Sequence, residues 1–241
     1  MFSFGSHHPR KTTVHGRQYG HHHGHHGHSQ EKQGFSKVRA VHNVAKGPNV
    51  NVVLDGKIAL ENVGYMAVSD YLKVPSGRHT VAITTTDGSK TLASATVTLS
   101  PGSDYTVIAH GDVTDLSTLS LLALQDDNSC PKMGKAHVRF IHAAATVPDV
   151  DVWANMENKV FSNVSYGQTG KPVYLPVAAG EISIAVTPAG SGDVVLGPID
   201  LRLDSGKTYT IVASGLLEDD DAPISAIISQ DNACATVHGG F

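Results

Sequence analysis

Apolar and polar residues alternate in two segments that lie one hundred residues apart in the chain. The first reads Val-Arg-Ala-Val-His at residues 38–42, and the second reads Val-Arg-Phe-Ile-His at residues 138–142. A further short alternation follows each, Val-Asn-Val at 50–52 and Val-Asp-Val at 150–152. Alternation with a period of two is typical of half-buried β-strands. We therefore expect Val38, Ala40 and His42 to share one face of a strand, opposite Arg39 and Val41.

Turn-forming residues divide the first hundred-residue unit at regular intervals. The clearest signals are Asp55-Gly56, Pro75-Ser76-Gly77, Asp87-Gly88 and Pro101-Gly102. Between them the pattern predicts strands near residues 37–44, 49–54, 58–63, 69–74, 78–86, 91–99, 104–110 and 117–124. Short strands with turns every 8–12 residues are typical of a β-sandwich. The sequence therefore predicts an all-β chain.

The same pattern recurs in a second unit, which makes the chain a tandem repeat. The units end at matching positions, where Asp127 aligns with Asp231 and Cys130 with Cys234. We expect a tail at 1–35, β-sandwich repeat 1 at 36–131, β-sandwich repeat 2 at 136–235 and a short C-terminal tail at 236–241. Because the linker between the repeats is short, the two sandwiches should pack against one another.

These motifs resemble the domain of unknown function 4397 family. Its domains begin with a Val-Arg-Val-Val-His strand, followed by a proline, a Val-Asp-Val strand, a Pro-Ala-Gly turn and a Gly-x-x-Tyr-Thr-Val strand. The matching residues are Val38 to His42, Pro48, Asn51, Pro75-Ser76-Gly77 and Tyr105-Thr106-Val107 in the first copy, and Val138 to His142, Pro148, Asp151, Ala178-Ala179-Gly180 and Tyr209-Thr210-Ile211 in the second. The resemblance implies tandem immunoglobulin-like β-sandwich domains in an exported or surface protein, and it brings no catalytic residues.

Charge is unevenly distributed along the 241 residues. The formal net charge is -4, but residues 1–34 carry four Lys and Arg against one Glu, so the tail is +3 and the remainder is -7. Acidic domains disfavour nucleic acid as a partner. No run of about 18 apolar residues predicts a membrane span. The first residues lack the apolar core of a signal peptide, so we expect a processed chain or another export route.

The tail has a strongly biased composition, with nine of the fifteen histidines in residues 1–34. Glycine interrupts the histidines at its centre, which are His21, His22, His23, His25, His26 and His28. Imidazole nitrogens bind zinc, copper and nickel, so these residues form a candidate metal site. The alternatives are a disordered tail or an expression tag. We expect no other cofactor.

Several residues in the repeats are candidates for chemistry. His42 and His142 precede the bend into the next strand, where we expect a structural role and no catalytic one. Asp149 and Asp151 would project from one face of a strand, where two carboxylates can hold calcium.

Three further features have functional alternatives. The acidic run Glu218-Asp219-Asp220-Asp221 is a second calcium candidate, although charge runs in loops are usually only solvated. Asn163 starts an Asn-Val-Ser glycosylation sequon. Trp153, the single tryptophan, is a candidate platform for stacking on a sugar.

The two cysteines occupy equivalent positions after the last strand of each repeat. We expect Cys130 and Cys234 to be oxidised, because an exported chain has no other evident use for such a pair. A disulfide tolerates a Cα separation of only about 4.4–6.8 Å. Either the domains pack side by side, or the bond joins neighbouring subunits.

The leading functional hypothesis is a non-enzymatic extracellular or cell-surface structural protein that assembles with itself into a filament. The tail segment with strand-like composition would add a strand to a neighbouring copy, through Thr12, Thr13, Val14, His15, Arg17 and Tyr19. The alternative is a monomeric surface-attached module that binds carbohydrate or protein, with a metal-binding His-rich tail and with surface glycans as partners. The sequence holds no nucleophile elbow and no phosphate-binding loop, so we expect no enzyme.

Overall fold

The computed structural model describes residues 34–232 and 234. Within them the chain forms strands and turns and no helix, which confirms the predicted all-β class. It follows that none of these residues belongs to a helix that could span a membrane. The histidine cluster and the assembly segment of the tail lie outside the described residues, as does the C-terminal tail.

Repeat 1 folds into two four-stranded sheets. Its strands are β1 (Phe35–Ala45), β2 (Val50–Leu54), β3 (Lys57–Val63), β4 (Leu72–Pro75), β5 (Gly77–Thr85), β6 (Thr91–Leu99), β7 (Asp104–Asp112) and β8 (Asp115–Gln125). The inner sheet has the order β4-β1-β7-β8 and the outer sheet the order β3-β2-β5-β6. The predicted strand at 69–74 is wrong in its bounds. Ser69 lies outside β4 because its hydroxyl accepts a bond from the Ala40 NH instead (2.9 Å).

Repeat 2 repeats this topology. Its strands are β9 (Lys135–His142), β10 (Val150–Ala154), β11 (Asn158–Val164), β12 (Gln168–Thr169), β13 (Leu175–Ala178), β14 (Gly180–Pro188), β15 (Leu196–Leu203), β16 (Thr208–Ser214) and β17 (Ser225–Asp231). The inner sheet is β12-β9-β16-β17, with β13 also on β9, and the outer sheet is β11-β10-β14-β15. In both repeats the first strand pairs in parallel with the strand that carries the Tyr-Thr motif.

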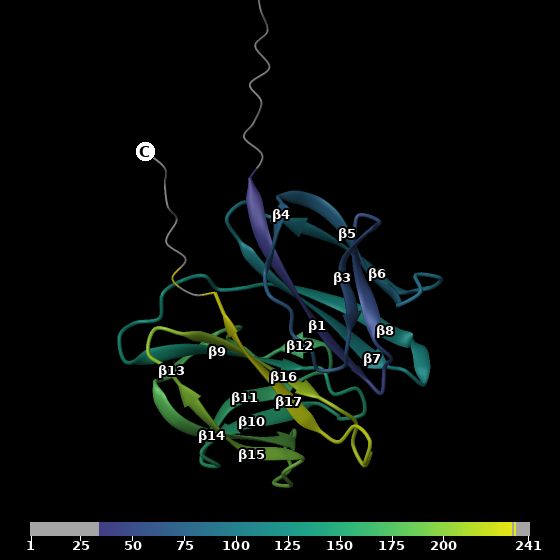
Figure 1. Cartoon of the computed structure of the whole chain (residues 1–241). Helices are drawn as coiled ribbons and strands as arrows, with labels where there is room; N and C mark the ends of the chain where they lie inside the picture. Colours follow the sequence, from purple (N-terminus) through teal and green to yellow (C-terminus); the bar gives the residue numbers. More distant parts are fainter. Residues whose placement is uncertain (1–33, 233, 235–241) are drawn as a thin grey trace, which may run out of the picture. The chain divides into compact units, whose positions relative to one another are not determined.

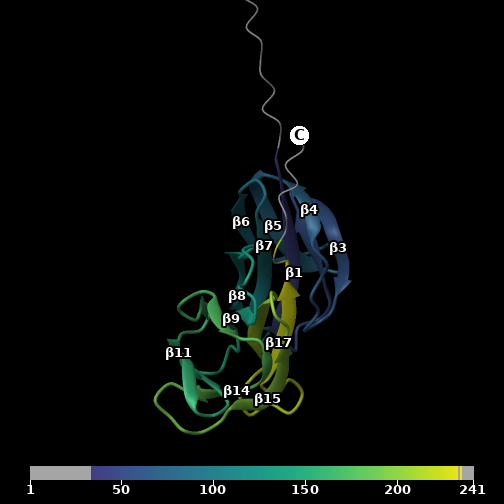
Figure 2. The same ribbon diagram turned by 90° about the vertical axis from the view of Figure 1, so that its left-hand side faces the viewer.

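The inner sheets of the two repeats pack against each other, with β1, β7 and β8 on one side and β9, β16 and β17 on the other (Figures 1 and 2). Val41, Ile108, Ile141, Val212 and Ile227 form the buried apolar part of this junction. The expectation of half-buried strands is therefore wrong for the central strands β7 and β16, whereas β8 and β17 keep exposed positions. In β7 and β16, nearly every residue is buried, because one face covers its own core and the other covers the second repeat.

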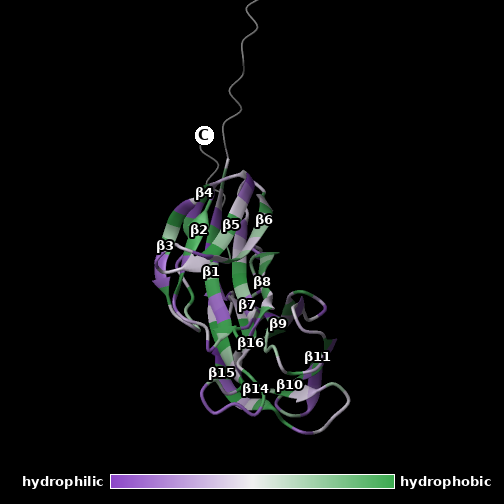
Figure 3. Cartoon of the chain, turned by 90° about the vertical axis from the view of Figure 1, so that its right-hand side faces the viewer, coloured by the Kyte–Doolittle hydropathy of each residue, from purple (hydrophilic) through white to green (hydrophobic). Residues whose placement is uncertain are grey.

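Hydrophobic and hydrophilic positions still alternate along β1, as Figure 3 shows. Each repeat has its own core between its two sheets, and the two cores differ in their large residues. In repeat 2, Phe140 and Phe161 stack with ring centroids 6.1 Å apart. Repeat 1 has Ala40 and Leu60 at these positions, and both line an apolar cavity of about 30 Å³.

Candidate functional site

The junction between the repeats contains two buried arginines at equivalent strand positions. Arg39 on β1 and Arg139 on β9 are only 2% and 0% exposed. They occupy the strand face that turns away from the core of their own repeat, so each guanidinium enters the junction. Arg39 Nε donates to Thr106 Oγ1 (2.9 Å), and Arg139 Nε donates to Thr210 Oγ1 (3.1 Å). The parallel strand pairs place these residues in register.

Each guanidinium then reaches the end of the last strand of the other repeat. Arg139 Nη2 donates to Asp126 Oδ1 (2.6 Å) and Arg139 Nη1 to the Gln125 carbonyl (3.2 Å). Arg39 makes the corresponding pair of bonds, to Asp231 and to the Gln230 carbonyl. The two repeats thus exchange equivalent ion pairs, related by an approximate two-fold axis.

Two tyrosines close this cluster. The Arg39 guanidinium lies 4.9 Å from the centre of the Tyr71 ring, and that of Arg139 lies 4.8 Å from the centre of the Tyr174 ring. Tyr71 donates to Asp126 Oδ2 (2.6 Å) and Tyr174 to Asp231 Oδ2 (2.8 Å). Burial first and the nearby carboxylates second raise the pKa of both tyrosines far above the ordinary value, although the arginines oppose this shift, so both hydroxyls remain protonated donors.

The threonines complete the set of bonds to the carboxylates. Thr106 Oγ1 donates to Asp126 (2.8 Å) and Thr210 Oγ1 to Asp231 (2.7 Å). Both carboxylates are almost fully buried. Because their oxygens already accept bonds from an arginine, a threonine and a tyrosine, they are poorly suited to act as a base or to bind a metal. The arrangement instead fixes how the two repeats are oriented.

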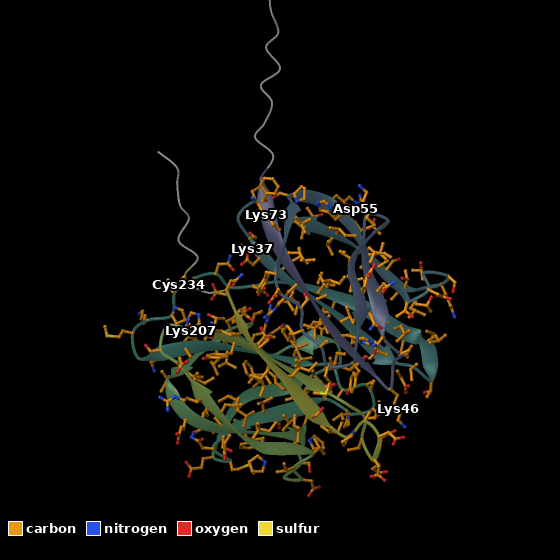
Figure 4. All side chains as sticks on the ribbon, in the orientation of Figure 1. Lys37, Lys46, Asp55, Lys73, Lys207 and Cys234 are labelled. Carbon is orange, nitrogen blue, oxygen red and sulfur yellow. A yellow bond between two sulfur atoms is a disulfide. The ribbon has the colours of Figure 1, made fainter. Side chains whose placement is uncertain are left out.

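Contacts at the two ends of the junction reinforce this orientation. At one end, Lys46 Nζ contacts Asp219 (2.5 Å) and Asp221 (3.6 Å), which lie in the acidic run after β16. At the other end, Cys130 and Cys234 form a disulfide with a Cα separation of 4.6 Å. Figure 4 labels Lys46 and Cys234 at these two places. Of the alternatives left open by the sequence, the structure has side-by-side domains with the bond inside one chain.

The approximate two-fold axis also relates two tyrosine contacts across the junction. Tyr65 shares a hydrogen bond with Ser214 (2.8 Å), and Tyr166 shares one with His110 Nδ1 (2.9 Å). Tyr65 follows β3 and reaches the end of β16, whereas Tyr166 follows β11 and reaches the end of β7. Burial lowers the pKa of His110, so the imidazole is neutral near pH 7.

The strand-end histidines hold the loop that follows them. His42 Nε2 lies 3.0 Å from the Pro48 carbonyl, and the Val44 NH donates to His42 Nδ1 (3.3 Å). His142 Nε2 lies 2.9 Å from the Pro148 carbonyl. Burial lowers the pKa of both histidines, although the carbonyl contacts oppose the shift. A neutral imidazole that donates from Nε2 therefore anchors each loop, as the sequence suggested.

Asp151 is used for structure inside repeat 2. Its carboxylate accepts bonds from Lys159 Nζ (2.6 Å), the Asn163 NH (2.8 Å) and the Gly190 NH (3.2 Å). Burial raises the pKa of Asp151, but these donors outweigh it and lower the pKa to about 2. The second carboxylate of the calcium hypothesis, Asp149, accepts a bond from a serine (2.9 Å). Both carboxylates of the pair therefore accept bonds from protein donors.

The equivalent of Asp151 in repeat 1 is Asn51, which departs from the family pattern for a local reason. Where repeat 2 has Lys159, repeat 1 has Ile58, so the cation that bonds to Asp151 is replaced by an apolar side chain at the equivalent position. The Asn51 amide accepts from the Asn62 NH (3.0 Å) and donates to the Thr86 carbonyl (3.1 Å). A neutral side chain that both accepts and donates fits these partners better than a carboxylate does.

The remaining candidates are distributed over different surfaces. Asn163 is exposed on the edge strand β11. Trp153 donates from Nε1 to Thr187 (3.1 Å), and the Lys159 ammonium lies 5.0 Å from the centre of its ring. Within residues 34–232 and 234, no group of three or more His, Cys, Asp or Glu side chains is arranged to hold a metal ion. The acidic run is bonded to Lys46 and to its own backbone.

The sequence interpretation missed the arginine cluster and misaligned one of its members. It matched Asp127 with Asp231, whereas the structure gives the role of Asp231 to Asp126. Asp127 instead contacts His137 Nδ1 (3.1 Å). The available signal was an arginine at the centre of an apolar strand in both repeats.

The fold and the junction define a tandem β-sandwich protein whose two repeats pair through a buried, approximately two-fold interface. The profile of the domain of unknown function DUF4397 matches residues 36–153 and again 136–240. The chain therefore belongs to the DUF4397 family, as the sequence motifs indicated.

Comparison with solved structures gives only distant likenesses. A structure of family 41 carbohydrate-binding modules from streptococcal virulence factors, described as recognising α-glucan, is 12% identical, with 78% of this chain and 96% of that chain covered and a TM-score of 0.25. A second streptococcal virulence factor, described as binding α-glucan, is 14% identical, with 84% and 99% covered and a TM-score of 0.26. The Bacillus anthracis TIE protein is 10% identical, with 76% and 34% covered and a TM-score of 0.25. Scores at this level carry no argument about function. No curated protein matches the sequence.

Proposed function

We propose that the chain is a non-enzymatic extracellular structural protein whose copies assemble into a filament. In this assembly the N-terminal tail of each copy adds a strand to a sheet of its neighbour. The observation that carries the proposal is that the two repeats form one rigidly connected unit whose outer sheets have unpaired edge strands. The repeats are held together by buried ion pairs and a disulfide, while strands such as β3, β6, β11 and β15 end their sheets.

The disulfide supports an extracellular location. Disulfides persist in oxidising compartments and are rare in reducing ones. In the described part of the chain both cysteines form a disulfide, and no cysteine there is a free thiol. Asp149, Asp151 and Asp219, which were candidates for chemistry in the sequence, accept internal bonds, and this supports a structural role over an enzymatic one.

Charge and reach support the tail as the donor. Repeat 2 holds 12 Asp and Glu against 5 Lys and Arg, so the net charge of -7 on the residues after the tail lies mainly in repeat 2. This negative charge can attract the tail, whose net charge is +3. The 33 residues before Gly34 would span roughly 110 Å if fully extended, at about 3.3 Å per residue. An edge strand such as β15 presents unpaired backbone groups that an added strand satisfies.

Deletion of residues 1–34 tests this proposal. We expect full-length protein to form filaments in negative-stain images and the truncated protein to remain folded and monomeric by light scattering. Salt should slow assembly, because screening weakens the steering of the tail. If the truncated protein forms the same filaments, the tail is not the assembly device.

A second candidate function rests on a polar concavity of repeat 2. Asn155, Glu181, Ser183, Asp200 and Arg202 line an open hollow of about 590 Å³ on the outer sheet. Several hydrogen-bonding groups on one concave surface suit a polar ligand such as a glycan or a protein loop. In this alternative the chain is a monomeric surface-attached binding module. It predicts a full-length monomer that binds oligosaccharides in calorimetry and loses binding in Asp200→Ala.

A further inference from the structure

The interface between the repeats is self-complementary. Each repeat contributes an arginine from its first strand, a threonine from the parallel strand, a tyrosine over the guanidinium and an aspartate at the end of its last strand. Every one of these groups has an equivalent in the other repeat, and the ion pairs cross between the repeats in both directions. An isologous contact of this kind is the geometry of a two-fold dimer.

Only the linker makes this pairing intramolecular. Repeat 1 of one copy can form the same bonds with repeat 2 of a second copy, because the contacting surfaces are unchanged. Exchange of an identical element between copies costs little when the contact itself is preserved. The competition is therefore between closure within one chain and pairing between two chains.

The linker has the features of a hinge. Eight residues, 127–134, separate the buried Asp126 from the start of β9, and none of them belongs to a strand. Met133 within it is 93% exposed. The hinge consists of residues 131–133, because Cys130 lies before them and the Gly134 NH is bonded to Ser205 of repeat 2 (2.8 Å). Cys130 therefore moves with repeat 1 when the hinge opens. The contact of Asp127 with His137 (3.1 Å) crosses between the repeats, so it passes to the second copy together with the ion pairs.

The Cys130–Cys234 disulfide fixes covalently whichever pairing of repeats exists when the bond forms. Cys130 lies in the linker after repeat 1, and Cys234 follows the last strand of repeat 2. The bond therefore joins the two members of a repeat pair. If these belong to one chain, the bond is intramolecular, and if they belong to two chains, the same bond joins the chains covalently.

We propose that this protein pairs with a second copy of itself by exchanging repeats, and that the Cys130–Cys234 bond locks the exchanged form. Reciprocal exchange gives a closed dimer, and successive exchange gives a covalent chain. In each bond-forming step, two thiols lose two protons and two electrons to a small-molecule disulfide, which is reduced to two thiols. This contact does not use the tail, so it goes beyond the proposed function and does not depend on it.

The test uses two full-length variants, Cys130→Ser and Cys234→Ser. Neither can form the native bond alone, but a mixture can form it between a Cys130 and a Cys234 from different chains. The variants are unfolded, mixed and refolded together with oxidised and reduced glutathione. We expect a covalent dimer of twice 25.3 kDa on a non-reducing gel, whose bond maps to Cys130 and Cys234 by mass spectrometry.

The matched control mixes the same variants after each has been refolded separately. Prefolded chains have already paired their own repeats, so this mixture should give at least tenfold less of the mapped cross-link. Equal cross-linking in the two mixtures, or none after co-refolding, would overturn the proposal. The same variants without residues 1–34 should cross-link equally, which separates this contact from the tail.

Unmodified protein gives a second measurement in case a cysteine variant does not fold. Exchange is bimolecular and closure is unimolecular, so the ratio of exchanged to closed chains should rise about tenfold for a tenfold rise in refolding concentration. Short flexible linkers give effective concentrations in the millimolar range, so about 0.1 mM protein should yield on the order of 10% covalent oligomer. A product that stays monomeric across this range would contradict repeat exchange.

Discussion

Replacing Arg139 with methionine removes one cation from the centre of the junction and keeps most of the side-chain volume. Arg139 is fully buried, and it bonds to Asp126, to Thr210 and to the Gln125 carbonyl. In Arg139→Met the carboxylate of Asp126 remains buried without its ion pair. Breaking a buried pair by removing one partner costs about 3–5 kcal/mol. At about 2–4 °C per kcal/mol for a chain of this size, the melting temperature should fall by roughly 6–20 °C.

The assay is urea unfolding followed by circular dichroism, together with a thermal scan, with the disulfide intact. Arg202→Met is the matched control, because Arg202 is 78% exposed at the side chain and its nearest carboxylate is 3.8 Å away. Exposed pairs of this kind contribute about 0–1 kcal/mol. The double variant Arg139→Met with Asp126→Leu should recover part of the loss, since no unpaired charge remains. If Arg139→Met is no less stable than Arg202→Met, the buried ion pairs do not hold the repeats together.

Three other perturbations have expected outcomes. Cys234→Ser should lower the free energy of unfolding in urea by about 2–5 kcal/mol, because the bond closes a loop across 104 residues, and an unchanged midpoint would contradict this. Burial lowers the pKa of His42, His110 and His142 below 6.5, so the unfolded chain binds more protons than the folded chain in mild acid. The free energy of unfolding should therefore be highest above pH 6.5 and decrease below it. A melting temperature that does not change between about pH 7.5 and pH 5 would refute this argument. Phe140→Ala should cost about 3–5 kcal/mol in the same urea assay, and a loss below 1 kcal/mol would show that the core of repeat 2 collapses to fill the space.

The sequence by itself determined the elements and their repetition. Alternation and turn residues depend on neighbours a few positions apart, so the strands of repeat 1 could be predicted, with the largest error at β4 and differences of one or two residues at most other strand ends. The family was indicated by its short sequence motifs. The loop-holding role of His42 was also accessible, because its partner Pro48 lies six residues away.

Only the tertiary structure decided which faces meet. Arg39 and its partner Asp231 are 192 residues apart, and no local pattern encodes that contact. An arginine in an alternating strand indicates a solvated face, unless a second sheet with a matching carboxylate covers it. The same limit left open whether Cys130 bonds within the chain, because that depends on the side-by-side packing of the two inner sheets. Periodicity defines one buried face of a strand, whereas burial of both faces is a property of the assembled repeats.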